Sequence, residues 1–149
     1  MKDQVLSIEQ MQHLNELGVD TSKASMVLII TDPYGDILDW DEEIFGFNEE
    51  EKNLEYFDAE TGNYDHSYRK DCGVFTLQDI LDLLPKEIFY DETRFRLRTE
   101  RFDDIWSVIY FGFDNTMLVS FDMNNLLNAA YEMLCWCAEN GYVKTNKEE

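Results

Sequence analysis

Residues 94–141 read RFRLRTERFDDIWSVIYFGFDNTMLVSFDMNNLLNAAYEMLCWCAENG, and the expected fold class follows mainly from them. Cationic and apolar residues alternate from Arg94 to Thr99, and this period of two residues predicts a β-strand with its arginines on one face. Two apolar runs, 105–113 and 117–121, are separated by an Asp-Asn turn and predict two more strands. Because the connections are short, we expect the three strands to form an antiparallel meander.

A long helix is expected directly after the meander. Asp122 is its expected N-cap, and the helix should run to about Asn140 and end at Gly141. Its apolar stripe is wide enough for burial on more than one side, and the part around Trp136 offers a surface for a homo-oligomer. The stripe comprises Leu126, Ala130, Met133, Leu134 and Cys137, widened by Leu127, Tyr131 and Trp136.

The first half of the chain carries signals for two short helices and a hairpin. The helices are expected at 7–17 and 76–84, because each begins with the spacing of a capping box. Strands are expected at 25–31 and 37–40, on either side of a turn rich in Asp, Pro and Gly. We therefore expect an α+β fold in a single domain, 1–149, in which two or three helices pack on one face of an antiparallel sheet made of the hairpin and the three-stranded meander.

Composition and charge limit the classes of function. The 149 residues include 32 Asp and Glu against 12 Lys and Arg, which gives a net charge of −20, and 44% are hydrophobic. Such a chain can build a core but has few cations to displace counterions from a phosphate backbone, so we expect no direct nucleic-acid binding. The longest aliphatic run, 26–30, is too short to span a membrane, and the N-terminus lacks signal-peptide features. Together with an odd count of three cysteines, this predicts reduced thiols in the cytoplasm and no membrane association.

An acidic segment with interleaved aromatic residues is expected to be an insertion at about 41–70. Ten carboxylates and a single lysine lie between Asp39 and Glu60. A purely solvated acidic loop has no need of aromatic side chains, so this segment is expected either to fold back on the body or to meet a partner. Five aromatic residues are the candidates for partner binding: Trp40, Phe45, Phe47, Tyr56 and Phe57.

A second candidate surface is the arginine stripe of the first meander strand. Arg94, Arg96 and Arg98, with Arg101 just beyond, hold four of the 12 basic residues. One interpretation is that they neutralise the acidic insertion or neighbouring strands of the same protein. The other is that they form a docking face for an acidic partner or an anion, and the sequence leaves both open.

No motif in the sequence points to catalysis, a cofactor or a metal ion. Among so many acids, adjacent carboxylates carry little information, and His13 and His66 each lack a second histidine nearby. Cys135 and Cys137 would project about 200° apart on a helix, so the two thiols cannot easily share one ion. We therefore expect no cofactor, no metal site and no enzymatic activity.

The chain also resembles a group of small acidic proteins without an assigned activity from Bacteroides-type gut bacteria, their phages and their mobile elements. The resemblance lies in FTLQDILDLLPKEI at 75–88, WSV at 106–108 and NLLNAAYEMLCWC at 125–137, with NGY at 140–142. The N-terminal 6–26 is similar as well, and only the acidic insertion is left out. The resemblance implies a bacterial, intracellular accessory protein and brings no activity, cofactor or functional residue with it.

Three hypotheses of function follow from these observations. The first is a non-enzymatic interaction module whose protein partner is unknown. The alternative is an acidic mimic of a nucleic acid that occupies a DNA- or RNA-binding protein, because like charges on a rigid body can compete for a basic groove. The second alternative is an enzyme with an unrecognised site.

Overall fold

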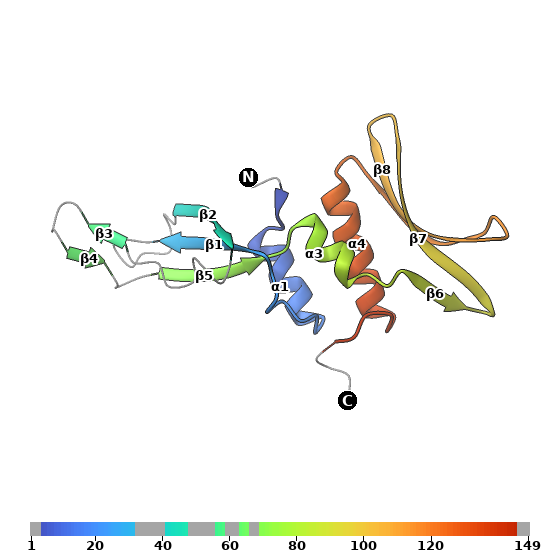
Figure 1. Cartoon of the computed structure of the whole chain (residues 1–149), viewed down its shortest axis with the longest axis horizontal. Helices are drawn as coiled ribbons and strands as arrows, with labels where there is room; N and C mark the ends of the chain where they lie inside the picture. The colour runs from blue at the N-terminus through green and yellow to red at the C-terminus, as the bar shows by residue number, and fades with distance from the viewer. Residues whose placement is uncertain (1–3, 32–40, 48–55, 59–62, 66–68, 146–149) are drawn as a thin grey trace.

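The computed structural model describes the backbone of residues 4–31, 41–47, 56–58, 63–65 and 69–145, and the side chains of 4–26 and 73–145. Among these residues the helices lie in the middle of the molecule, and antiparallel sheets lie at its two ends (Figure 1). This arrangement confirms the α+β class. The described helices are α1 (Ile8–Glu16), α3 (Leu77–Leu83) and α4 (Leu126–Glu139).

The C-terminal sheet is a four-stranded antiparallel meander in the order β6-β7-β8-β9. Its register places Phe95 opposite Gly112 and Val108 opposite Phe121. The three strands expected from the sequence are present, and a short strand that the sequence analysis did not anticipate pairs with the first of them. The four strands are β6 (Glu87–Tyr90), β7 (Thr93–Phe102), β8 (Ile105–Gly112) and β9 (Met117–Met123).

Both short helices begin with the expected capping boxes. The Ser7 hydroxyl accepts a hydrogen bond from the backbone N–H of Gln10 at 3.1 Å, and the Gln10 side chain accepts one from Ser7 N–H at 2.9 Å. Thr76 and Asp79 make the same reciprocal pair at the start of α3, at 3.2 and 2.9 Å. Four N–H groups that no helical carbonyl can reach are thus satisfied, which fixes where α1 and α3 start.

The start of the long helix corrects the sequence prediction. Asn125, not Asp122, is the N-cap of α4, and its side-chain oxygen accepts a hydrogen bond from Asn128 N–H at 3.1 Å. Asp122 belongs to β9, because the β8–β9 ladder continues until Met123 pairs with Trp106. The helix ends as expected, with Gly141 in the left-handed region at a φ of +78°.

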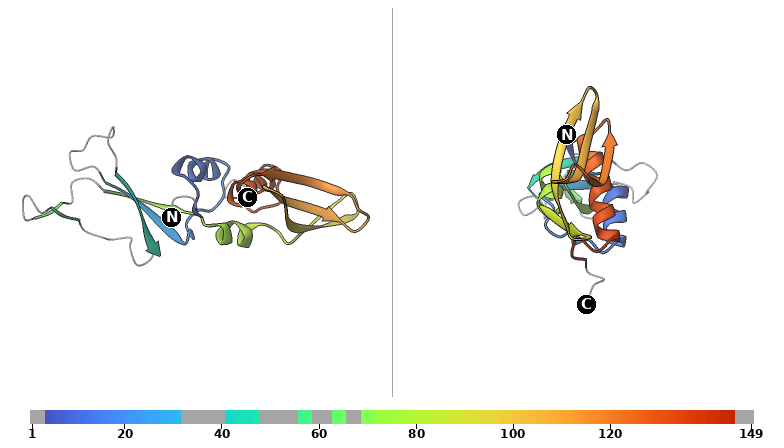
Figure 2. Two further views of the ribbon diagram at one scale, coloured as in Figure 1. Left: turned by 90° about the horizontal axis from the view of Figure 1, so that it is seen from above. Right: turned by 90° about the vertical axis from the view of Figure 1, so that its right-hand side faces the viewer.

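The N-terminal half contains a second antiparallel sheet that extends away from the helices (Figures 1 and 2). The strand expected at 25–31 is present, while the strand expected at 37–40 lies outside the described residues. The central strand instead pairs with one that starts at Asp41, inside the segment expected to be an insertion. The strands of the sheet, in the order β2-β1-β5, are β1 (Met26–Thr31), β2 (Asp41–Phe47) and β5 (Arg69–Val74), and a smaller pair is formed by β3 (Tyr56–Asp58) and β4 (Asn63–Asp65).

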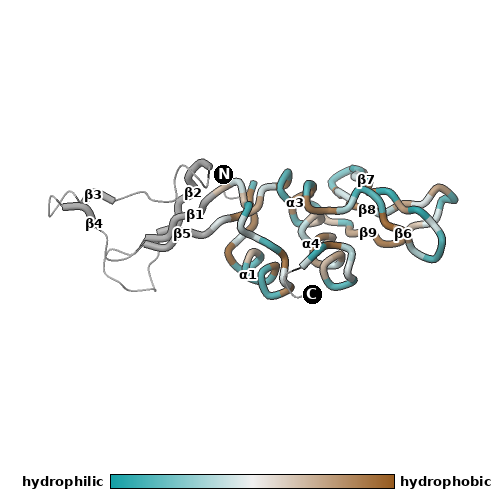
Figure 3. Tube along the Cα trace, turned by 60° about the horizontal axis from the view of Figure 1, so that its bottom comes forward, coloured by the Kyte–Doolittle hydropathy of each residue, from teal (hydrophilic) through white to brown (hydrophobic). Residues whose placement is uncertain are grey.

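The hydrophobic core joins the helices to the inner face of the β6–β9 sheet. Figure 3 shows hydrophobic stretches in these helices and strands, which alternate with hydrophilic ones at turns and along α1 and β7. α4 packs on β8 and β9 and also contacts α3, so this chain's own elements cover much of its wide apolar stripe. Trp136 is half-buried and stacks on Tyr142, with 5.4 Å between ring centroids. The largest fully buried side chains are those of Tyr110, Phe75, Leu6, Leu14, Ile80, Met133 and Leu134.

No helix in the described part of the chain is long and apolar enough to cross a membrane.

Candidate binding surface on the four-stranded sheet

The large apolar side chains that the described residues leave exposed gather on the β6–β9 sheet. They lie at or near its three turns, and none belongs to a described helix. A scattered exposed apolar residue is ordinary, but a concentration on one sheet indicates that a part of this sheet meets another molecule. The exposed residues are Phe89, Tyr90, Phe102, Ile105, Phe113 and Met117.

The arginine stripe lies on the face of this sheet that points away from the helices. On β7, Phe95 is buried in the core, while Arg94, Arg96 and Arg98 stay between 45% and 57% exposed. The period of two in the sequence predicted this separation of faces. We call this surface the arginine face; it comprises Glu87, Phe89, Arg94, Arg96, Arg98, Phe111 and Phe113.

Two glutamates form ion pairs with the three arginines, one from the adjacent strand β6 and one from β7 itself. Arg94 Nε lies 3.4 Å from Oε2 of Glu87, and Arg96 Nε lies 3.3 Å from Oε1 of the same carboxylate. Arg98 reaches Glu100 on its own strand, with 2.7 Å between Nη2 and Oε1. One interpretation of the stripe was neutralisation by neighbouring strands, and these ion pairs agree with it for the described residues. Both carboxylates belong to the same sheet as the arginines.

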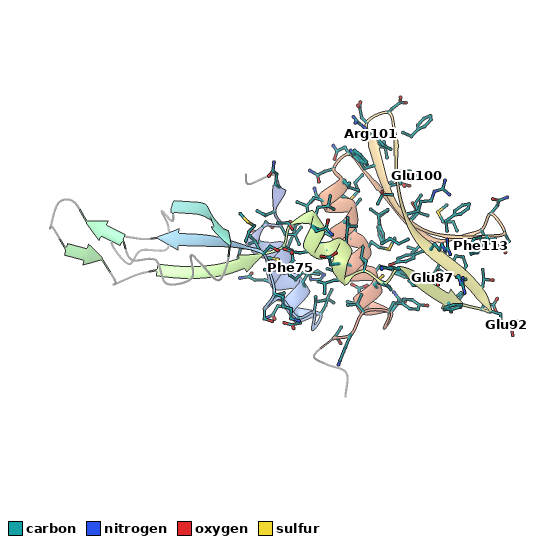
Figure 4. All side chains as sticks on the ribbon, viewed as in Figure 1. Phe75, Glu87, Glu92, Glu100, Arg101 and Phe113 are labelled. Atoms are coloured by element: carbon teal, nitrogen blue, oxygen red, sulfur yellow. The ribbon has the colours of Figure 1, made fainter. Side chains whose placement is uncertain are left out.

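Each of these arginines also lies over an aromatic ring. The guanidinium carbon of Arg94 is 5.4 Å from the centre of the Phe89 ring, that of Arg96 is 5.0 Å from Phe113, and that of Arg98 is 5.2 Å from Phe111. Near the β7–β8 turn Arg101 lies over Trp106 in the same way, at 5.3 Å. Figure 4 shows Glu87 and Phe113 in the wide part of the sheet, and Glu100 and Arg101 toward that turn. Such stacks fix the arginine side chains and leave their polar edges open.

A shallow pocket of about 350 Å³ lies on the arginine face between β7 and β8. Side chains of arginine and phenylalanine line it together with Leu97 and Gly112. Gly112 lies opposite Phe95, so a side chain at this position would point to the inner face of the sheet. A Cβ at Gly112 would come within 2.9 Å of the Thr116 hydroxyl and 3.2 Å of the Phe95 ring, so close packing requires glycine here. The pocket is lined by Arg96, Leu97, Arg98, Phe111, Gly112 and Phe113.

The cysteines of α4 are poorly suited to chemistry. Cys135 and Cys137 are buried free thiols, and burial raises the pKa of each to about 11. A thiol at this pKa holds almost no thiolate at neutral pH, and the thiolate is the reactive form.

His13 lies at the surface, 3.9 Å from a carboxylate oxygen of Glu16, and the described residues contain no group of His, Cys, Asp and Glu arranged to hold a metal ion.

The structure separates the two candidate surfaces that the sequence suggested. Phe45 and Phe47 lie on β2, and Tyr56 and Phe57 lie on β3, at the opposite end of the molecule from β7 (Figure 1). Their side chains, and the whole of Trp40, lie outside what the structure describes. The arginines instead meet aromatic residues that the sequence analysis did not single out: Phe89, Phe111 and Phe113. The alternation Phe111-Gly112-Phe113 could have identified the last two, because residues two apart in a strand lie on the same face.

The chain matches no protein-family model, no curated protein and no solved structure.

Proposed function

We propose that this protein is a non-enzymatic, cytoplasmic interaction module that binds a partner protein through its arginine face. The observation that carries the proposal is the set of exposed phenylalanine rings, Phe89 and Phe113 above all, stacked with arginines on a sheet face that no described element covers. Aromatic residues and arginine are the types that concentrate at protein interfaces and dominate their binding energy.

The proposal differs from the sequence-based one in where the partner binds. The acidic segment was the first candidate, and its aromatic side chains are not among those described. The alternative of an acidic nucleic-acid mimic depends on the carboxylates of the same segment and stays a prediction.

Affinity capture with matched phenylalanine variants tests the proposal. Tagged full-length protein, Phe113→Ser and Phe102→Ser are used to capture partners from lysate of the native host, and the captured proteins are quantified by mass spectrometry. We expect Phe113→Ser to lower recovery of the partner about tenfold or more, because an interface anchor contributes more than about 1.4 kcal/mol. Phe102→Ser makes the same chemical change at the β7–β8 turn and should keep the partner. Equal recovery with Phe113→Ser and the unchanged protein would contradict the proposal.

A further inference from the structure

We propose that the arginine face recognises a short acidic segment of the partner, with one or two carboxylates next to an apolar side chain. The carboxylates contact the guanidinium groups of Arg94 and Arg96, and the apolar side chain enters the pocket beside Phe111 and Phe113. This inference rests on the proposed function and specifies the chemistry of the partner.

The hydrogen-bond geometry of the arginines provides the first argument. Arg94 and Arg96 both turn Nε toward Glu87, and within the described part of the chain neither arginine makes another polar contact. The terminal Nη pair of each guanidinium therefore keeps its donors free. That pair forms the forked, two-bond contact with a carboxylate that makes arginine the preferred residue for this recognition.

Preorganisation provides the second argument. Arg94 and Arg96 are each held by one oxygen of Glu87, and their guanidinium groups lie over the rings of Phe89 and Phe113. A ring face accepts no classical hydrogen bond from these contacts, so the guanidinium donors that do not face Glu87 stay available to a carboxylate. Less side-chain entropy is then lost on binding than at free surface arginines.

Charge provides the third argument. Arg94 and Arg96 share the single carboxylate of Glu87, so this part of the arginine face has an excess of one positive charge, whereas Glu100 balances Arg98. The net charge of the whole chain is −20. At physiological salt the screening length is about 8 Å, so an incoming carboxylate interacts more strongly with this local positive charge than with the distant acidic segment. Carboxylates also stand at the turns of the sheet, at Asp91, Glu92 and Asp114. These carboxylates would repel the ends of a long acidic run. They therefore favour a short acidic segment that binds across the middle of the face.

The pocket provides the fourth argument. Its volume of about 350 Å³ lies at the lower end of the range for ligand sites, and its walls are two phenylalanine rings and two arginine stems. These walls suit a single apolar side chain with a negative charge beside it.

A peptide titration of the full-length protein tests the inference. The probes are the blocked peptide Gly-Asp-Phe-Glu-Gly and its uncharged counterpart Gly-Asn-Phe-Gln-Gly, added to ¹⁵N-labelled protein and followed by the NMR shifts of β7 and β8 amides. We expect the acidic peptide to shift these amides and to bind about tenfold or more tightly than the uncharged one. The double variant Arg94→Gln, Arg96→Gln should lose the difference between the peptides. Arg101→Gln makes the same kind of substitution near the β7–β8 turn, where it removes one positive charge, and should keep this difference.

The outcomes separate this inference from the proposed function. Equal binding of both peptides, or no shift with either, overturns carboxylate recognition, while loss of partner capture in Phe113→Ser still supports the binding surface. A dimer in sedimentation analysis that Phe113→Ser dissociates would show that a second copy occupies the face, and would overturn the inference as well. Partner capture unaffected by Phe113→Ser overturns both.

Discussion

At the scale of single residues, Tyr110 connects three elements through its hydroxyl. The side chain is fully buried on β8, and its hydroxyl donates a hydrogen bond of 2.6 Å to the Pro85 carbonyl, just after α3. The same hydroxyl hydrogen-bonds with the Cys137 thiol of α4, and burial raises the pKa of Tyr110 far above its usual value. The hydroxyl thus joins strand β8, the end of α3 and α4 at one point within the core.

Replacing Tyr110 with phenylalanine should therefore destabilise the fold. The ring still fills its site, but the Pro85 carbonyl loses its donor in a place that water reaches poorly. We expect Tyr110→Phe to lower the free energy of unfolding by about 1–2 kcal/mol, measured by urea denaturation. Tyr90→Phe makes the same change on a ring that is 55% exposed and should stay within about 0.5 kcal/mol of the unchanged protein. Equal losses in the two variants would mean that the hydroxyl contact is not what stabilises this junction.

At the scale of elements, the start of α4 makes a second prediction. Asn125 supplies the capping oxygen, and Asn124 stands exposed one position earlier. We expect Asn125→Ala to lower the free energy of unfolding by about 1 kcal/mol, and Asn125→Asp to restore it because aspartate caps equally well. Asn124→Ala serves as the matched control and should change stability by less than about 0.5 kcal/mol. The cap assignment fails if Asn124→Ala proves the more costly of the two alanine variants in thermal unfolding.

The same junction shows why some elements were predictable and others were not. Local patterns sufficed where one pattern dominated: the capping boxes placed α1 and α3, and the alternation from Arg94 placed β7 and its exposed face. Between Asp122 and Asn125 several residues can cap a helix, and the choice depends on how far the β8–β9 ladder runs. Strand β6 is only four residues long, which is too short for a clear sequence pattern, and it is stabilised as a strand by pairing with β7.

The candidate site divides in the same way. Its arginines are neighbours in sequence and were predicted, whereas their phenylalanine partners come from β6 and the end of β8. Which ring meets which arginine is a matter of strand register, because shifting a strand by one residue sends its side chains to the other face. Local sequence does not contain that register.

At the scale of the whole molecule, residues 28–72, which include the acidic segment, are attached to the rest through two adjacent strands, β1 and β5. At the base of the N-terminal sheet, Met26 pairs with Val74 and Val27 with Gly73. Beyond this base β1, β2 and β5 extend away from the helices (Figures 1 and 2). The buried cluster that joins the helices to the β6–β9 sheet combines residues 5–24 with residues 74–143. The chain thus leaves the core and returns to it at one place.

This topology predicts that residues 28–72 can be replaced by a two-residue Asn-Gly turn. Val27 and Gly73 are already opposite each other, and Asn-Gly favours the tight turn of a β-hairpin. We expect the shortened chain to unfold cooperatively in thermal denaturation, and its β7 and β8 amides to keep the NMR shifts of the full chain. It should also bind the acidic peptide with unchanged affinity, because the arginine face lies at the opposite end. A broad, non-cooperative transition would instead show that the strands between Leu28 and Cys72 are part of the same folding unit as the helices.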